Sequence, residues 1–179
     1  MLYVHRYVFA LIKTDLKEEF AKFGIPEAEH NEVLGFLAAG FSAAYGLFQI
    51  PAGMVIDYFG AHLFLTGSMV VWSLGFGLLA LAPSTGVMYA SRYTLGLGQS
   101  GVLAGIGRLT KVWFPAESRS SAQGLMGVTA SRSGAFCCYI FFPLAMLYLF
   151  ADSWQTSVLA LSSLGLVWAV LFFRYVKNS

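Results

Sequence analysis

The sequence predicts an all-α protein, a polytopic bundle of transmembrane helices with about five full spans and the C-terminal part of a first span. Composition is the first reason, because 58% of the 179 residues are hydrophobic and only 11% are charged, with a mean hydropathy of +0.68. Soluble domains carry about 25% charged residues. The second reason is that five apolar stretches are each long enough to cross a bilayer, which takes roughly 20 helical residues.

The five expected spans follow one another along the chain. They cover residues of about 33–56, 61–82, 86–107, 122–150 and 156–176. A further apolar run, at about 2–12, is interrupted by His5 and Arg6. It would rise only about 16 Å as a helix, whereas the hydrocarbon core is about 30 Å thick. The N-terminus also lacks the basic leader of a secretory signal. We therefore expect the chain to begin midway through a helix, as a fragment of a longer protein would.

The charges between the spans predict an orientation. Residues 13–32 form a polar, partly helical connection, and the joint at 83–85 carries no charge. These joints alternate along the chain with a second set that carries five basic residues: Arg108, Lys111, Arg119, Arg174 and Lys177. Short cytoplasmic loops are enriched in lysine and arginine. We therefore expect a multi-pass protein of the cell inner (plasma) membrane, with residues 13–32 outside and the C-terminus in the cytoplasm.

Several kinds of site are disfavoured by the sequence. The segment GLGQSG, residues 96–101, matches the dinucleotide fingerprint G-x-G-x-x-G, but it lies inside an expected span and does not follow a strand. The adjacent Cys137 and Cys138 are expected to pack inertly, and the spacing of metal ligands is absent. Neither a nucleophile–base constellation nor a basic nucleic-acid stripe is present. We expect no cofactor, no metal, no nucleic-acid partner and no enzymatic activity.

Polar residues inside the expected spans are candidates for a binding site. A charge at the bilayer centre costs at least about 2.5–3.5 kcal/mol on insertion scales, so it usually faces a cavity or a partner. The candidates are His5 with Arg6; Ser42, Tyr45 and Gln49; Arg92, Gly96 and Gln99; and Arg132. The alternatives are helix–helix hydrogen bonding for Tyr45 and Gln49, and carbonyl pairing or snorkelling for the arginines. No acidic residue lies deep in a span, and cations without counter-charge that face one cavity favour an anionic ligand.

The joint between the first two full spans reads GMVIDYFGAH, residues 53–62, and places one carboxylate between two apolar segments. It resembles the motif G-x-x-x-D-x-x-G-[RK]-[RK] of the major facilitator superfamily, with matches at Gly53, Asp57 and Gly60. In that family the aspartate braces the cytoplasmic gate of the outward-open state. Tyr58 and the pair at 61–62 replace basic residues of the motif. The resemblance therefore implies that Asp57 stabilises the closed gate more weakly, or that it pairs with Arg108 or Arg119.

Four further matches extend the resemblance over nearly the whole chain. Arg92, Gly96 and Gly98 fit the fourth-helix pattern R-x-x-x-G-x-G of the family. The segments WFPAESRSSAQG (113–124), FSAAYGLFQIPAG (41–53) and YVHRYVFALIKTDLKEEF (3–20) are similar to the anion:cation symporter branch. Members of the superfamily have two six-helix halves with the site between them. The resemblance implies that residues 1–179 form one half-domain, the N-terminal half, whose C-terminal half is missing.

The resemblance also implies roles for individual residues. Arg6 and Arg92 would clamp the carboxylate of a small organic anion, such as a sugar acid, and Tyr3 and Tyr45 would line it. Two positions where proton-coupled members carry acids hold His5 and Gln99 here. We expect Gln99 to contact the substrate, and His5 is the coupling candidate because it titrates near neutral pH. Proton coupling through His5, sodium coupling and exchange are all open.

Two other functions are weighed against transport by alternating access. One is a non-transporting membrane sensor or assembly protein derived from a transporter half. The other is a membrane-embedded enzyme, which is disfavoured because the spans contain no acid–base pair. Transport of an organic anion across the lipid bilayer is the function that the sequence favours.

Overall fold

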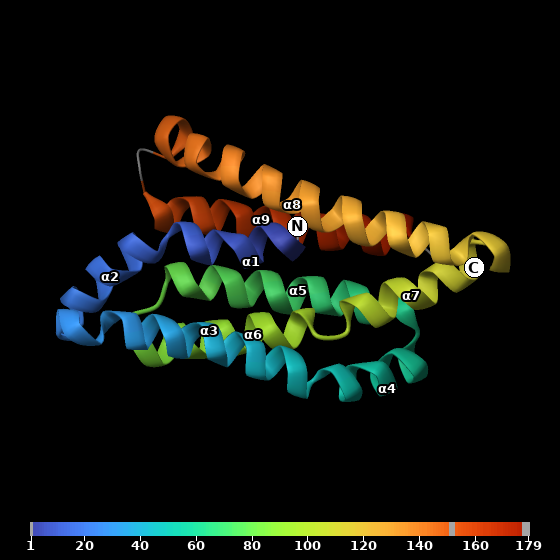
Figure 1. The fold of residues 1–179 in the computed structure, drawn as a ribbon, viewed down its shortest axis with the longest axis horizontal. Coiled ribbons are helices and arrows are strands. Elements are labelled where there is room, and N and C mark those ends of the chain that lie inside the picture. The colour runs from blue at the N-terminus through green and yellow to red at the C-terminus, as the bar shows by residue number, and fades with distance from the viewer. Residues whose placement is uncertain (1, 151–152, 177–179) are drawn as a thin grey trace.

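The computed structural model describes residues 2–150 and 153–176, and every regular element within them is helical (Figure 1). The elements are α1 (Leu2–Leu11), α2 (Lys13–Lys22), η1 (Glu27–Glu29), α3 (His30–Leu47), α4 (Gln49–Phe59), α5 (Ala61–Ala80), α6 (Thr85–Gln99), α7 (Val102–Trp113), η2 (Ala116–Ser118), α8 (Arg119–Leu149) and α9 (Trp154–Tyr175). The predicted all-α class is confirmed for the described residues.

Two expected spans are each divided into two helices. The segment expected at 33–56 begins earlier, at His30, and is bent by 46° between α3 and α4. Pro51 lies in the first turn of α4, where a missing N–H group is tolerated, and it cannot donate to the carbonyl one turn before it. The segment expected at 86–107 is divided into α6 and α7 at Ser100 and Gly101. Within the described residues, α5, α8 with η2, and α9 are long and apolar enough to cross a bilayer, and the bent pair gives a fourth candidate.

The first helix continues beyond the expected end at residue 12. The amide of Ile12 donates to the Val8 carbonyl at 3.1 Å, and the amide of Leu16 donates to the Ile12 carbonyl at 2.9 Å, so the helical bonding passes from α1 into α2. Val8, Ile12, Leu16 and Phe20 are all completely buried. Their four-residue spacing places them on one face, and this face explains why the polar segment after Leu11 stays helical.

Helix α5 lies at the centre of the bundle, where it packs along α6 and α9, while α3 packs on α6 and α1 on α8 (Figure 1). Glycines permit the closest of these contacts. A Cβ atom on Gly98 of α6 would lie 2.7 Å from the backbone nitrogen of Trp72 in α5. A side chain at this position would therefore push the two helices apart.

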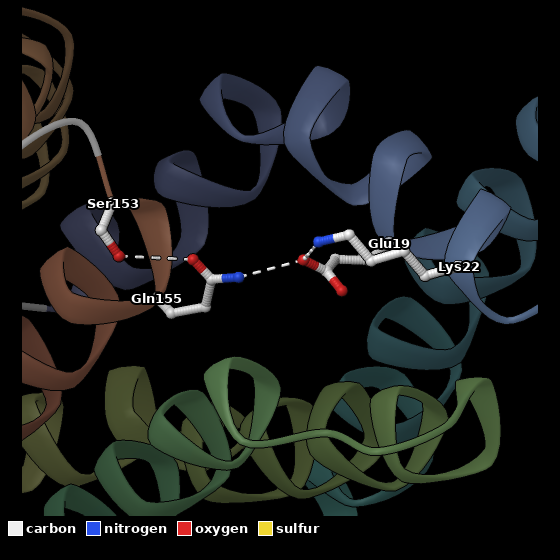
Figure 2. Close-up of polar contacts among 4 residues, drawn as sticks. All are labelled: Glu19, Lys22, Ser153 and Gln155. Atoms are coloured by element: carbon white, nitrogen blue, oxygen red, sulfur yellow. Dashed lines mark hydrogen bonds and ion pairs between the residues drawn. The ribbon is translucent and has the colours of Figure 1, made fainter.

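The joints of the two sets that fall within the described residues lie at opposite ends of the bundle (Figure 1), and Lys177 of the second set lies outside those residues. At one end, Glu19 of α2 accepts hydrogen bonds from Lys22 at 2.8 Å and from Gln155 of α9 at 3.0 Å (Figure 2). Ser153, the N-cap of α9, donates to the side-chain oxygen of Gln155 at 3.4 Å. At the other end, the ring of His62 in α5 donates to the Phe173 carbonyl of α9 at 3.1 Å. Polar contacts therefore tie α9 to the bundle at both ends.

Candidate substrate-binding site

Arg6 of α1 lies among aromatic rings and one amide. Its Cζ atom is 4.9 Å from the ring centre of Tyr45, 5.1 Å from that of Phe41 and 5.6 Å from that of Tyr3. Its Nε and Nη2 atoms donate to the side-chain oxygen of Gln99 at 3.3 and 3.1 Å. The structure thus brings together Arg6, Tyr3, Tyr45 and Gln99, which the sequence placed in one site.

Gln99 is fully buried at the C-terminal end of α6. Its oxygen accepts both bonds from Arg6, and its Nε2 atom donates to the Leu2 carbonyl at 3.3 Å. The amide therefore orients the guanidinium without neutralising its charge. A glutamate in the same place would neutralise it and would compete with any bound anion.

Arg92 of α6 is only 3% exposed and has no carboxylate beside it among the described residues. Its Nε atom donates to the Leu37 carbonyl at 3.4 Å, and its Cζ atom lies 4.0 Å from the ring centre of Phe9 and 4.9 Å from that of Phe41. Its Nη1 atom is buried without a hydrogen-bond partner in the described part of the chain. Burying a charged group with an unsatisfied N–H group is costly, and a hydrogen bond to an anion would offset part of that cost.

Phe41 of α3 contacts both arginines, and the sequence analysis did not identify it. The signal that could have found it is its position four residues before Tyr45, which puts the two rings on one face of α3. Gly96 of α6 lies directly against this position, because a Cβ atom on Gly96 would be 2.4 Å from the Phe41 carbonyl oxygen. The glycine of the fourth-helix motif is therefore required for the close approach of α3 and α6 at the site.

His5 lies on a different face of α1 from Arg6. Its ring is completely buried, stacks on Phe76 at 4.4 Å between ring centres, and donates to the Leu161 carbonyl at 3.2 Å. Its Nδ1 atom and the Ser73 hydroxyl have no partner among the described residues. His5 thus faces α5 and α9 and is not brought to the arginines, and its role in coupling stays a prediction.

The residues of the predicted gate lie at the end of the bundle where α4 meets α5 and α7. Asp57 accepts a hydrogen bond from Arg108 of α7, so Arg108 is the basic partner that the sequence offered as one of two candidates. The other candidate, Arg119, donates to the carbonyls of Phe114 and Lys111 at 3.0 and 2.9 Å and so caps the end of α7.

The two glycines of the gate motif differ in what they do. Gly60 has φ = +83°, a conformation that residues with a side chain rarely adopt, and it forms the turn between α4 and α5. A Cβ atom on Gly53 would meet nothing within 4 Å in the described part of the chain. A structural need for glycine is therefore evident at Gly60 but not at Gly53.

Other candidates lie apart from the arginine cluster. Ser42, Gln49 and Arg132 are exposed. A cavity of about 1100 Å³ lies between α1, α7, α8 and α9, and the described residues that line it include Tyr3 but neither Arg6 nor Arg92. Within the part of the chain that the structure describes, no group of three or more His, Cys, Asp or Glu side chains could hold a metal ion.

Comparison with known proteins decides the family. A sequence model described as the Major Facilitator Superfamily matches residues 2–179. The chain belongs to the major facilitator superfamily.

The relatives of this facilitator chain include transporters of organic anions. It is 34% identical over 145 residues to the hexuronate transporter of Bacillus subtilis, covering 81% of this chain and 33% of that protein. It is 30% identical over 143 residues to the galacturonate transporter of Dickeya chrysanthemi, covering 80% of this chain and 40% of that protein. It is 27% identical over 146 residues to a probable sulfoacetate transporter of Cupriavidus necator, covering 82% of this chain and 33% of that protein. The chain thus spans about a third of the length of these curated relatives.

A solved structure supports the facilitator fold. The crystal structure of a bacterial homologue of the human lysosomal transporter Spinster, in an inward-facing and occupied conformation, superposes with a TM-score of 0.70 at 17% sequence identity. The match covers 98% of this chain and 42% of that chain. At this identity the likeness concerns the fold alone.

Proposed function

We propose that this chain acts as the N-terminal half of a permease that carries a small organic anion, such as a sugar acid, through the inner membrane by alternating access. The observation that carries the proposal is the cluster around Phe41. Two guanidinium groups from α1 and α6 lie there without a carboxylate beside them among the described residues. A carboxylate between them would satisfy the buried Nη1 atom of Arg92 and compensate both charges.

The surrounding groups fit a sugar acid better than a simple carboxylate. Tyr3 and Tyr45 supply phenolic hydroxyls and partly buried rings beside Arg6, and Gln99 supplies an amide. Such groups suit a polyhydroxylated substrate, because hydroxyls need both donors and acceptors and sugar rings stack on aromatic faces. The hexuronate and galacturonate transporters among the relatives support the same substrate class.

The gate residues fit the conformational step of this proposal. Asp57 on α4 and Arg108 on α7 join two helices at the end of the bundle that we assign to the cytoplasm. A contact of this kind biases the equilibrium between outward-open and inward-open states if it exists in only one of them. The second half of the permease, which this proposal requires, would supply the opposing wall of the site.

Three coupling modes are compatible with the residues of this half. Gln99 carries no titratable proton, so it supports sodium coupling or exchange, whereas proton coupling would have to use His5 or a group in the other half. Uptake measurements separate the three modes. Collapse of the proton gradient tests proton coupling, replacement of sodium tests sodium coupling, and loading of vesicles with unlabelled substrate tests exchange.

The test of the proposed function is uptake by the complete transporter in cells that lack their own hexuronate permeases. Labelled galacturonate, glucuronate and tartrate are compared with neutral galactose. We expect saturable uptake of at least one acid and no uptake of galactose above that of cells without the transporter. A transporter that prefers galactose or a cation would defeat the proposal, and the absence of uptake for every compound would favour a non-transporting sensor or assembly protein.

A further inference from the structure

One aromatic ring serves both arginines of the cluster. The ring centre of Phe41 lies 5.1 Å from Cζ of Arg6 and 4.9 Å from Cζ of Arg92. Each arginine also has rings of its own, Tyr45 and Tyr3 for Arg6 and Phe9 for Arg92. Phe41 is the ring that the two share.

The position of this ring is closely determined by its surroundings. Phe41 is 8% exposed, and its ring stacks on Tyr45 with 6.0 Å between centres and 21° between planes. The backbone beside it is closely packed as well, because its carbonyl oxygen would lie 2.4 Å from a Cβ atom on Gly96. Arg92 also donates to the carbonyl of Leu37, one turn earlier. The contacts thus fix the ring relative to α6, the helix that carries Arg92.

The electrostatics of the cluster give the ring a specific task. Two guanidinium groups near one another repel, and neither has a carboxylate beside it within the described residues. The face of an aromatic ring carries negative potential and attracts a cation, whereas an aliphatic side chain of similar size does not. A phenylalanine at position 41 therefore stabilises both cations, while the buried Nη1 atom of Arg92 has no hydrogen-bond partner among the described residues.

We propose that Phe41 is a positioning residue for the transported anion: its ring holds the Arg6 and Arg92 guanidinium groups in place, so that a carboxylate meets a pair that is already oriented. This inference rests on the proposed function. Preorganisation of this kind raises affinity because the side chains lose less conformational freedom on binding. Phe41 thereby tunes substrate affinity without itself supplying a hydrogen bond to the anion.

The test compares variants of the complete transporter in two assays: equilibrium binding of galacturonate to the purified protein, and uptake in cells. We expect Phe41→Leu to raise Kd and KM about tenfold, because two cation–π contacts are lost, while the maximal uptake rate stays within about twofold. Phe41→Tyr retains the ring and should bind nearly as the wild type does. Phe36→Leu is the matched control, since Phe36 lies on the same helix with 56% of its surface exposed, and it should leave Kd unchanged.

The outcomes separate this inference from the proposed function. A wild-type Kd in Phe41→Leu would overturn the role of the ring, and so would an equal loss in Phe41→Leu and Phe41→Tyr, which would indicate packing shape instead of an aromatic face. If the leucine variant does not fold, Phe41→Met, which is flexible and similar in volume, is measured with the same expectation. A wild-type protein that binds no organic anion would defeat the proposed function, and this inference with it.

Discussion

The arginine cluster and the Asp57–Arg108 pair are two charged regions of one helical bundle with opposite construction. Arg92 is 3% exposed and Arg6 is partly buried, and both contact rings and neutral hydrogen-bond acceptors. Asp57 and Arg108 have 76% and 45% of their side chains exposed, and each is the other's counter-charge. Among the described residues, the two arginines of the cluster have no carboxylate beside them, whereas Asp57 and Arg108 form an ion pair.

On the basis of this difference we propose different tasks for the two regions. An exposed ion pair contributes only about 0–1 kcal/mol, so Asp57 and Arg108 can adjust an equilibrium between conformations but cannot hold a substrate. A buried cation without counter-charge is costly, and a bound anion relieves that cost. Substitutions in the buried region should therefore change binding, and substitutions in the exposed pair should change the conformational equilibrium.

The largest effect is expected from the arginines. Arg6→Lys and Arg92→Lys, in the complete transporter, each remove the planar fork that can hold a carboxylate in two hydrogen bonds, which a lysine cannot reproduce. Loss of about 1.5–3 kcal/mol corresponds to roughly 10- to 150-fold in affinity, so uptake of organic anions should nearly cease. The measurement is uptake normalised to the amount of protein in the membrane.

The matched control for the arginine variants is Arg132→Lys. Arg132 is exposed on α8 and fits none of the anion-site positions implied by the family resemblance, so its replacement should change uptake less than either of the other two. Normal uptake in Arg92→Lys, at wild-type levels of protein, would show that substrate binding does not depend on the planar guanidinium group of Arg92.

A smaller effect, which depends on pH, is expected from Gln99→Glu. The new carboxylate would pair with Arg6 and compete with the substrate for it, so uptake should fall about tenfold at neutral pH. Protonation of the carboxylate removes the competing charge, so uptake should recover as the medium is acidified. Gln49→Glu is the control, because Gln49 is exposed. If Gln99→Glu transports at the wild-type rate at every pH, the contact between Gln99 and Arg6 does not govern the site.

The exposed pair should give a weaker effect of another kind. Asp57→Asn should slow uptake by about fivefold or less and should change the Kd of the substrate by less than that, because an exposed pair is worth at most about 1 kcal/mol. Arg108→Gln should behave in the same way, and the double variant should be no worse than either single one, since both remove one interaction. Asp57→Asn with normal uptake would leave Asp57 as an ordinary solvated residue.

The smallest effect on uptake is expected from cysteine substitutions that are introduced to determine which end of the bundle faces the outside of the cell. In a background without Cys137 and Cys138, Lys22→Cys and Pro115→Cys place thiols at exposed positions at opposite ends of the bundle. In intact cells an impermeant maleimide should label the cysteine at 22 and not the one at 115. The reverse pattern would invert the orientation and would put the Asp57–Arg108 pair outside.

Sequence alone predicts the class of the fold but not where its helices break. Low charge and long apolar runs decide the class, because they leave no soluble alternative. The division of the segment at 86–107 near Gly101 depends on tertiary contact, since a Cβ atom there would lie 2.4 Å from the Phe64 ring. The extension of the first helix into α2 depends on burial of Leu16 and Phe20. Their spacing can be read in the sequence, but the neighbouring helices that cover them cannot.

The charged residues of the candidate site could be proposed from the sequence, whereas its apolar residue Phe41 could not. An arginine in an apolar run is conspicuous because burying its charge in the membrane costs free energy. The family resemblance placed Arg6 and Arg92 in one site. Phe41 is one phenylalanine among 16 in the sequence and has no such signal. The coupling role of His5 stays a prediction, although its ring faces other helices than Arg6 does, because adjacent helical residues point about 100° apart. His5 therefore contacts different helices from those that Arg6 contacts, although the two residues are adjacent in the sequence.

The central claim is that the buried arginine cluster binds a carboxylate, and equilibrium binding to the purified complete transporter tests it most directly. Isothermal titration compares galacturonate with galactose, which has the same ring but a hydroxymethyl group in place of the carboxylate. We predict saturable binding of galacturonate, at least about tenfold weaker binding of galactose, and loss of this preference in Arg92→Lys. Equal affinities for the acid and the sugar in the wild-type protein would contradict the account.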